Sequence, residues 1–142
     1  MRTGEARAAA LDWVRRHAAA DPGFRGAFLT GSAADRDGAQ PQPPWSDVDV
    51  TVVVAGDAAP PKPGKISHRG ALLDVNVVPE ALLADVQKVA ATHYLAPSFT
   101  GPPDRVLLDP TGLLGRLRAA IAPTFAEPAA VRRRVEDVLT AV

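Results

Sequence analysis

The spacing of apolar residues in the first half of the chain predicts a helix followed by two buried strands. Apolar side chains recur at helical spacing over residues 4–20, with Thr3 as the expected N-cap and a helix-breaking Asp-Pro-Gly sequence at 21–23. Short apolar runs at 26–30 and 47–54 are typical of buried strands. The first half therefore indicates a helix packed against a sheet.

The second half of the chain continues this alternation. We expect a hairpin of strands 65–69 and 71–78 turning at Arg69-Gly70, a helix from Pro79 to about 91, a strand at 105–109, a helix from Asp109-Pro110 to about 122, and a last helix from Pro128. In the last helix, Val131 and Val135 are expected to form a buried stripe, with Arg132 to Arg134 on a solvated face. This order predicts an α/β (α+β) fold, a mixed β-sheet flanked by helices, without internal repeats. Residues 1–142 are expected to form one domain, in which 128–142 begin a helical C-terminal region.

Two carboxylates at the start of the strand 47–54 call for a source of positive charge. Asp47 and Asp49 share one face of that strand, roughly 7 Å apart along the chain, and their window offers no lysine and no arginine in register. A third acid, Asp74, interrupts the apolar run 71–78. Half-buried carboxylates without a partner are unfavourable, so we expect these three acids to converge on a cation.

The sequence Leu-Thr-Gly-Ser at 29–32 ends one predicted strand and opens a brief helix. The backbone N–H groups of Gly31 and Ser32 and the serine hydroxyl are suited to hold an anion there. Taken alone, such a turn is typical of an ordinary helix cap. Followed by Asp47 and Asp49, it provides the phosphate-binding half of a metal–nucleotide site, because carboxylates and substrate phosphates together complete the coordination of Mg²⁺.

Composition narrows the classes of protein to be considered. The 142 residues are 46% apolar and 23% charged, as in an ordinary globular chain. Lys plus Arg and Asp plus Glu both number 16, so there is no overall basic charge to indicate a nucleic acid as partner. Without cysteine there is no disulfide or thiolate metal site. No signal-peptide pattern or membrane-spanning run stands out, and we expect a cytoplasmic protein without a membrane partner.

Three segments, taken in order, resemble the polymerase-beta-like nucleotidyltransferase superfamily. They are "FLTGS" at 28–32, "WSDVDVTVVV" at 45–54 and "LLDVNVV" at 72–78, which together span a little over a third of the chain. The later "RVLLDPTGLLGRL" and "FAEPAAVRRRV" are similar to the join between catalytic and helical domains in small-molecule nucleotidyltransferases of the aminoglycoside-modifying kind. This resemblance again implies a mixed sheet flanked by helices.

The resemblance also implies a mechanism and a set of site residues. Two Mg²⁺ ions and ATP or another nucleoside triphosphate are the implied cofactor and substrate. Asp47 and Asp49 would ligate the metals, and Asp74 would bind the catalytic metal and help deprotonate an acceptor hydroxyl. Gly31 and Ser32 would hold the β and γ phosphates. Two metals stabilise both the attacking and the leaving oxygen of an in-line displacement.

One motif departs from the family pattern Gly-Ser-x-Ala-Arg-Gly. Asp35 stands where the basic residue is expected, and Arg36 follows one position later, from which we expect it to reach the triphosphate. Three functions are left open by these residues. The first is transfer of a nucleoside monophosphate, AMP from ATP, to a hydroxyl of a small, aminoglycoside-like molecule. The second is a minimal antitoxin-type transferase that AMPylates a partner protein, and the third is a nucleotide-binding module without turnover.

Five further residues each allow a functional and a structural interpretation. His68 and His93 are candidates for a base or a substrate contact, although isolated histidines more often serve packing. Trp45 is placed either to stack on a ring of a ligand or to anchor its loop. Lys62 and Lys65, in and after a proline-rich loop, are candidates for phosphate contacts.

Overall fold

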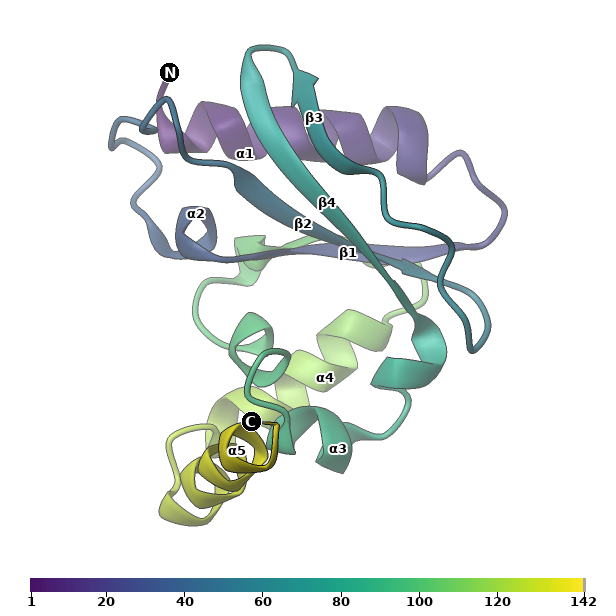
Figure 1. Ribbon diagram of the computed structural model, residues 1–142, viewed down its shortest axis with the longest axis vertical. Coiled ribbons are helices and arrows are strands. Elements are labelled where there is room, and N and C mark those ends of the chain that lie inside the picture. The colour runs from purple at the N-terminus through teal and green to yellow at the C-terminus, as the bar shows by residue number, and fades with distance from the viewer. Residues whose placement is uncertain (142) are drawn as a thin grey trace.

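The computed structural model describes residues 1–141 and contains a five-stranded mixed β-sheet with helices on both faces (Figure 1). The strands are β1 (Phe24–Thr30), β2 (Val48–Val54), β3 (Gly64–His68), β4 (Ala71–Pro79) and β5 (Val106–Leu108). They lie in the order β3-β4-β2-β1-β5, with β2 and β4 parallel and the other neighbouring pairs antiparallel. The predicted α/β fold with a mixed sheet is confirmed.

The helices form two layers around this sheet. They are α1 (Thr3–Trp13), continued as a π-helix over Val14–Ala18, α2 (Ser32–Asp35), α3 (Val86–Ala91), α4 (Leu113–Ile121) and α5 (Pro128–Thr140). Short 3₁₀ turns span Glu80–Leu83, Ala96–Phe99, Pro103–Arg105 and Ala122–Thr124. Helix α1 covers one face of the sheet, whereas α3 and α4 lie against the other (Figure 1). Among residues 1–141, no helix is long and apolar enough to cross a membrane.

The alternation of side chains in β2 decides which residues face which layer. Val48 and Val50 are fully buried in the core beneath α1, whereas Val53 belongs to the second core, beneath α3 and α4. Because side chains alternate with period 2, Asp49 points to the face opposite α1. The helices of that second layer leave this end of the strand only partly covered, since Asp49 is half-buried.

The two-residue turn predicted for the hairpin is confirmed. Arg69 and Gly70 join β3 to β4 with φ angles of 48° and 81°. Positive φ at both central residues is the signature of the tight turns that match the twist of a hairpin. The turn fixes the register of β3 on β4 and so determines which side chains face each other across the pair.

Three helix starts differ from the sequence prediction. The helix expected to begin at Pro79 is interrupted: that proline ends β4, and α3 starts only after Asp85, whose carboxylate accepts hydrogen bonds from the backbone N–H groups of Gln87 and Lys88 at 3.0 and 3.3 Å. The Asp85 cap thus divides the predicted helix into a 3₁₀ turn, Glu80–Leu83, and the short helix α3.

At the start of α1, Thr3 is the first helical residue and not the cap, because its buried hydroxyl donates to the side chain of Gln42 instead.

The helix expected directly after Asp109-Pro110 begins at Leu113, behind Gly112 in a left-handed conformation. The Asp109 carboxylate nevertheless binds the free backbone N–H groups at the start of this helix, because it accepts hydrogen bonds from Leu114 and Gly115 at 3.0 and 2.8 Å. The side chain thus caps the helix from outside its first turn.

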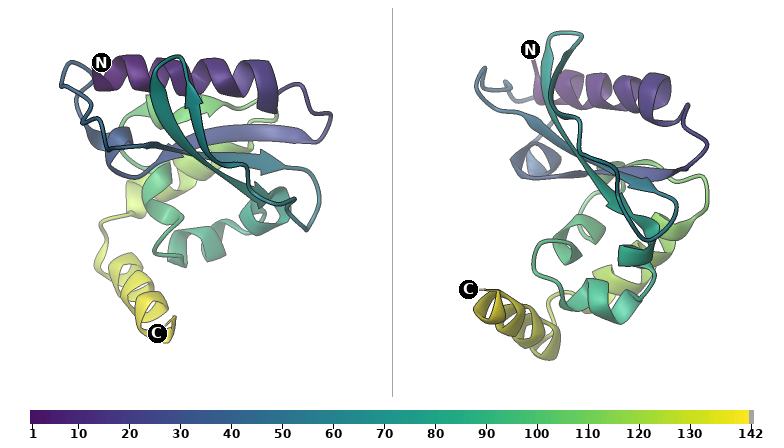
Figure 2. Two further views of the ribbon diagram at one scale, coloured as in Figure 1. Left: turned by 45° about the horizontal axis from the view of Figure 1, so that its top comes forward. Right: turned by 45° about the vertical axis from the view of Figure 1, so that its right-hand side comes forward.

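Helix α5 does not bury the stripe that its sequence predicts. Val131 and Val135 are 42% and 51% exposed, because α5 projects away from the sheet and contacts mainly α3 (Figure 2). Of the three arginines expected on a solvated face, Arg132 and Arg133 are exposed as predicted, whereas Arg134 is partly buried, with its guanidinium 3.9 Å from the ring centroid of Phe125. That 128–142 begin a helical C-terminal region stays a prediction.

Candidate metal and nucleotide site

The structure brings the three predicted acids together at one end of the sheet. Asp47 directly precedes β2, Asp49 lies within it, and Asp74 lies directly opposite Asp49 in the parallel pair β2–β4. One carboxylate oxygen from each of the three lies within 4.8 Å of the other two. This spacing is short enough for a single cation to contact all three side chains.

A lysine already lies among these acids. The Lys65 ammonium forms an ion pair with the Asp47 carboxylate and lies 3.9 Å from Asp74 Oδ2. The sequence offers no lysine within the segment around β2, and the partner comes instead from β3, outside that segment. Three carboxylates against one ammonium still leave two uncompensated negative charges when all are ionised.

The hairpin contained the signal that identifies this lysine. A two-residue turn at Arg69-Gly70 pairs residues at equal distances from it, so Lys65 in β3 faces Asp74 in β4. Opposite charges directly across an antiparallel pair stabilise it. The predicted turn therefore already implied the contact between this lysine and the third acid.

The pKa values of Asp47 and Asp49 shift in opposite directions. Burial raises the pKa of Asp49, and repulsion from Asp47 and Asp74 raises it further. In contrast, the hydrogen bond from Lys65 lowers the pKa of Asp47, and the same bond raises the pKa of the lysine. Of these two acids, Asp49 is therefore the one whose ionised form its surroundings disfavour.

The Gly31–Ser32 turn lies against that same carboxylate. Gly31 has φ 71° and ψ −171°, a conformation almost restricted to glycine. A Cβ at this position would overlap with the Asp49 carboxylate, so the backbone approaches the acid as closely as it does only because the residue is glycine. Both Gly31 and Ser32 are exposed, which leaves the turn accessible to a ligand.

Arg36, predicted to reach the triphosphate, has another partner in the structure. Its guanidinium donates to Gln42 Oε1 at 3.0 Å, while the neighbouring Asp35 forms an ion pair with the largely buried Arg105. These two contacts attach α2 to the loop before β2 and to the segment before β5. The described contacts thus give Arg36 a structural role.

A hollow of about 270 Å³ opens beside the acids. Its lining comprises Thr30, Asp49, Val50, Thr51, Lys62, Asp74 and Asn76. Lys62 is exposed, and its place in this lining agrees with the predicted phosphate contact without testing it. Thr30 and Asn76 were not singled out from the sequence, although Asn76 shares the face of Asp74 at the next alternate position of β4.

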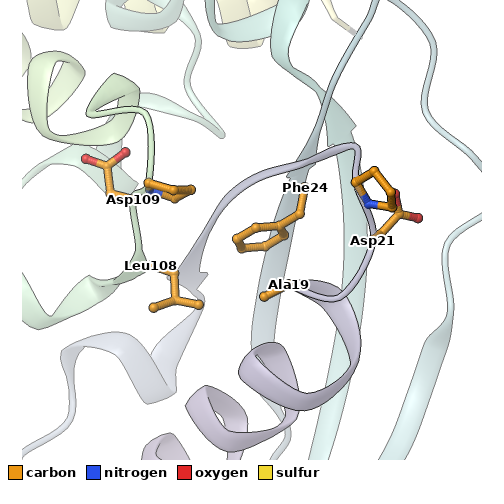
Figure 3. Close-up of a pocket in the computed structure, with 7 residues that line it drawn as sticks. Ala19, Asp21, Phe24, Leu108 and Asp109 are labelled. Carbon is orange, nitrogen blue, oxygen red and sulfur yellow. The ribbon is translucent and has the colours of Figure 1, made fainter.

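A larger hollow, of about 580 Å³, lies at the opposite end of β1 (Figure 3). Phe24 and Leu108 give it an apolar wall. Its two carboxylates are already engaged: Asp21 accepts from the N–H of Gly23 at 2.7 Å, and Asp109 caps α4. Both carboxylates of this larger hollow thus serve the local backbone. The smaller acidic hollow is therefore the better candidate for a ligand site.

The two candidate histidines pair with carboxylates elsewhere in the fold. His68 Nε2 lies 2.8 Å from Asp12 of α1, and His93 Nδ1 lies 2.6 Å from Asp137 of α5. These hydrogen bonds lower the pKa values of both acids; for Asp137 the larger effect comes from the backbone N–H of His93. The structural interpretation of both histidines is therefore favoured.

Trp45 does not anchor its loop, because its side chain is 81% exposed. The loop is held instead by Gln42, whose amide N–H₂ donates to the carbonyl of Ser46 at 3.0 Å and whose backbone N–H donates to the carbonyl of Met1.

No protein-family model matches this chain, and no curated protein matches it. Its function therefore has to be inferred from the chemistry of the site.

Proposed function

We propose that this protein is an Mg²⁺-dependent nucleotidyltransferase that moves a nucleoside monophosphate, AMP from ATP, onto a hydroxyl of a small molecule such as an aminoglycoside-like acceptor. The observation that carries the proposal is the convergence of Asp47, Asp49 and Asp74 beside the exposed Gly31–Ser32 turn. Carboxylates within reach of one cation and a glycine turn open to an anion are the two halves of a metal–triphosphate site.

The donor set fits Mg²⁺. All three side chains offer oxygen, the donor that this hard cation prefers, and two of their negative charges are not compensated by Lys65. Bound there, the metal would neutralise charge on the phosphates and polarise the phosphorus that is attacked. That two ions bind stays a prediction, and Asp47, Asp49 and Asp74 are the residues that would hold them.

The residues of the chain then have distinct tasks. Gly31 and Ser32 bind the β and γ phosphates through backbone N–H groups and a hydroxyl, which orients the α-phosphate toward the acceptor. Asp74, whose side chain is one-third exposed to the hollow, accepts the proton of the acceptor hydroxyl. A bond forms between the acceptor oxygen and the α-phosphorus. The bond between the α-phosphorus and the oxygen that bridges the α and β phosphates breaks, and pyrophosphate leaves.

A second acceptor class is supported by α5. The exposed apolar residues of this helix, among them Val131, Val135 and Leu139, are suited to contact another protein. A transferase that AMPylates a partner protein would use the same acids and a different acceptor. The two acceptor classes can be separated by supplying each with labelled ATP.

Binding is tested by thermal unfolding with Mg²⁺, ATP or both. A ligand that binds only the folded state raises the melting temperature, and we expect the pair to raise it more than either ligand alone. The Asp47→Asn/Asp49→Asn double variant should lose this cooperative shift, whereas Asp57→Asn, in an exposed loop, should retain it. An equal shift in the double variant would contradict the assignment.

Turnover is tested by pyrophosphate release with Asp74→Asn. This variant keeps the shape of the side chain but removes a charge needed as the hydroxyl becomes a nucleophile. General-base help is worth roughly 10²- to 10⁴-fold, so we expect a fall of at least that order, mainly in kcat. Near-normal turnover would show that another group takes the proton. Binding of Mg²⁺ and ATP without turnover by the wild type would favour a nucleotide-binding module.

A further inference from the structure

Trp45 is the most exposed large apolar side chain near the acids. Its side chain is 81% exposed, and it lies two residues before Asp47. Two trans peptide units place the two Cα atoms at most about 7.6 Å apart. An indole left in water beside a polar site is apolar surface that a ligand could cover.

The turn that carries this indole is held in place from several directions. Its backbone closes through the N–H of Ser46 donating to the carbonyl of Pro43 at 3.0 Å. The Gln42 side-chain oxygen accepts from Thr3 at the start of α1 and from Arg36 after α2, both at 3.0 Å. Two consecutive prolines, Pro43 and Pro44, further restrict the backbone. The exposure of Trp45 is therefore a property of a braced turn.

An exposed aromatic ring on a braced turn suits one kind of ligand group. Planar rings stack on tryptophan, and such stacking tolerates different bases because each has a π-face. A triphosphate held at the Gly31–Ser32 turn and the acids has its base at the other end of the ribose. Trp45, two residues before Asp47, is the exposed aromatic ring that lies nearest along the chain to the acids that would hold those phosphates.

We propose that Trp45 is a stacking platform for the nucleobase of the triphosphate substrate. The inference rests on the proposed nucleotidyltransferase function, because it requires phosphates at the neighbouring acids. A planar ring on the acceptor would offer the same chemistry, so the experiment has to distinguish the two sources.

The experiment uses the fluorescence of Trp45 itself. The chain has two tryptophans, and the Trp13→Phe variant leaves Trp45 as the sole reporter. With Mg²⁺ present, we expect ATP and GTP to quench this emission and inorganic tripolyphosphate to leave it unchanged, although tripolyphosphate should still raise the melting temperature.

The matching variants are Trp45→Ala and Trp45→Phe in the full chain. We expect the alanine variant to bind Mg²⁺–ATP about 5- to 150-fold more weakly, in line with the usual effect of removing a stacked ring. Its affinity for Mg²⁺–tripolyphosphate should not change, and the phenylalanine variant should retain most of the ATP affinity. Tyr94→Ala, which removes an aromatic ring that is 60% exposed beside His93, controls for loss of surface aromatic area.

Different failures have different meanings. Unchanged ATP affinity in Trp45→Ala would overturn the stacking proposal and leave the nucleotidyltransferase proposal intact. Quenching by an aromatic alcohol in the presence of Mg²⁺–tripolyphosphate, with unchanged ATP affinity in Trp45→Ala, would place the ring of the acceptor on Trp45 and overturn the nucleobase assignment. If neither ATP nor tripolyphosphate binds with Mg²⁺, the proposed function itself is wrong and the stacking proposal falls with it.

Discussion

Replacing Gly31 by alanine tests how the glycine turn and the acids depend on each other. The added Cβ has two effects that can be worked out separately. At φ 71° and ψ −171°, a side chain imposes a backbone strain of about 1–3 kcal/mol. The Cβ also overlaps with the Asp49 carboxylate, which must leave its rotamer at a further cost of about 0.5–1.5 kcal/mol.

The expected loss of stability for Gly31→Ala is therefore about 1.5–4.5 kcal/mol. The matched control is Gly56→Ala, because Gly56 also has a positive φ, 93°, but a Cβ there meets nothing within 4 Å. Its loss should stay near the strain alone, about 1–3 kcal/mol. Urea unfolding of both variants in EDTA measures the difference, which reports the collision with Asp49.

Metal binding provides the second readout for Gly31→Ala. Because Asp49 must move, we expect Mg²⁺ affinity, measured by calorimetry, to fall by at least about 10-fold, the lower end of what disturbing the surroundings of a metal ligand usually costs. Gly56→Ala should bind Mg²⁺ like the wild type. Equal stability losses in the two variants together with unchanged Mg²⁺ affinity in Gly31→Ala would refute the proposed coupling of turn and acid.

Lys65→Met should bind Mg²⁺ more tightly than the wild type in calorimetry without nucleotide, since the lysine competes for Asp47 and Asp74, whereas Lys88→Met on α3 should not. In EDTA, Asp49→Asn should be more stable than the wild type at neutral pH. Because the folded pKa of Asp49 is raised, its unfavourable contribution is absent below the unfolded pKa, grows between the unfolded and the folded pKa, and is complete above the folded pKa. Urea unfolding should therefore show the advantage of Asp49→Asn disappearing in acid. Val135→Ser on α5 should change the unfolding free energy by no more than about 0.5 kcal/mol, whereas Leu117→Ala, fully buried on α4, should cost about 2–5 kcal/mol; a large loss for Val135→Ser would show that α5 is covered in solution.

The strands could be predicted from the sequence because burial and periodicity agree there. The run that became β2 is rich in β-branched residues, and its alternate valines pack beneath α1 as a two-residue period requires. The helix starts were harder, because they depend on competition between caps. Asp85 and Asp109 both cap helices, but neither the break before α3 nor the extra turn before α4 follows from local propensity.

The burial of α5 could not be predicted from periodicity alone. Val131 and Val135 have the spacing of a buried stripe, but spacing shows only that a helix has an apolar side and does not show that another element covers it. In the fold, the partly buried side of α5 carries Ala130, Arg134 and Asp137, and the contacts of the last two are polar or cation–π. Tertiary context, set by where α3 lies, decided which side was covered.

The site shows the same division between local pattern and strand order. That Asp47 and Asp49 share a face follows from the chain alone, but their meeting with Asp74 requires β2 and β4 to be parallel neighbours in the right register. Lys65 comes from the next strand, β3. The two adjacent pairings, β2–β4 and β3–β4, therefore place this lysine and the three acids at one end of the sheet. The ammonium compensates Asp47 and approaches Asp74, whereas the pKa of Asp49 stays raised, first by burial and then by repulsion from Asp47 and Asp74. Lys65 on β3 therefore stabilises Asp47 and Asp74 in the absence of metal and leaves two of the three negative charges uncompensated, beside the Gly31–Ser32 turn at which we propose that a metal-bound triphosphate binds.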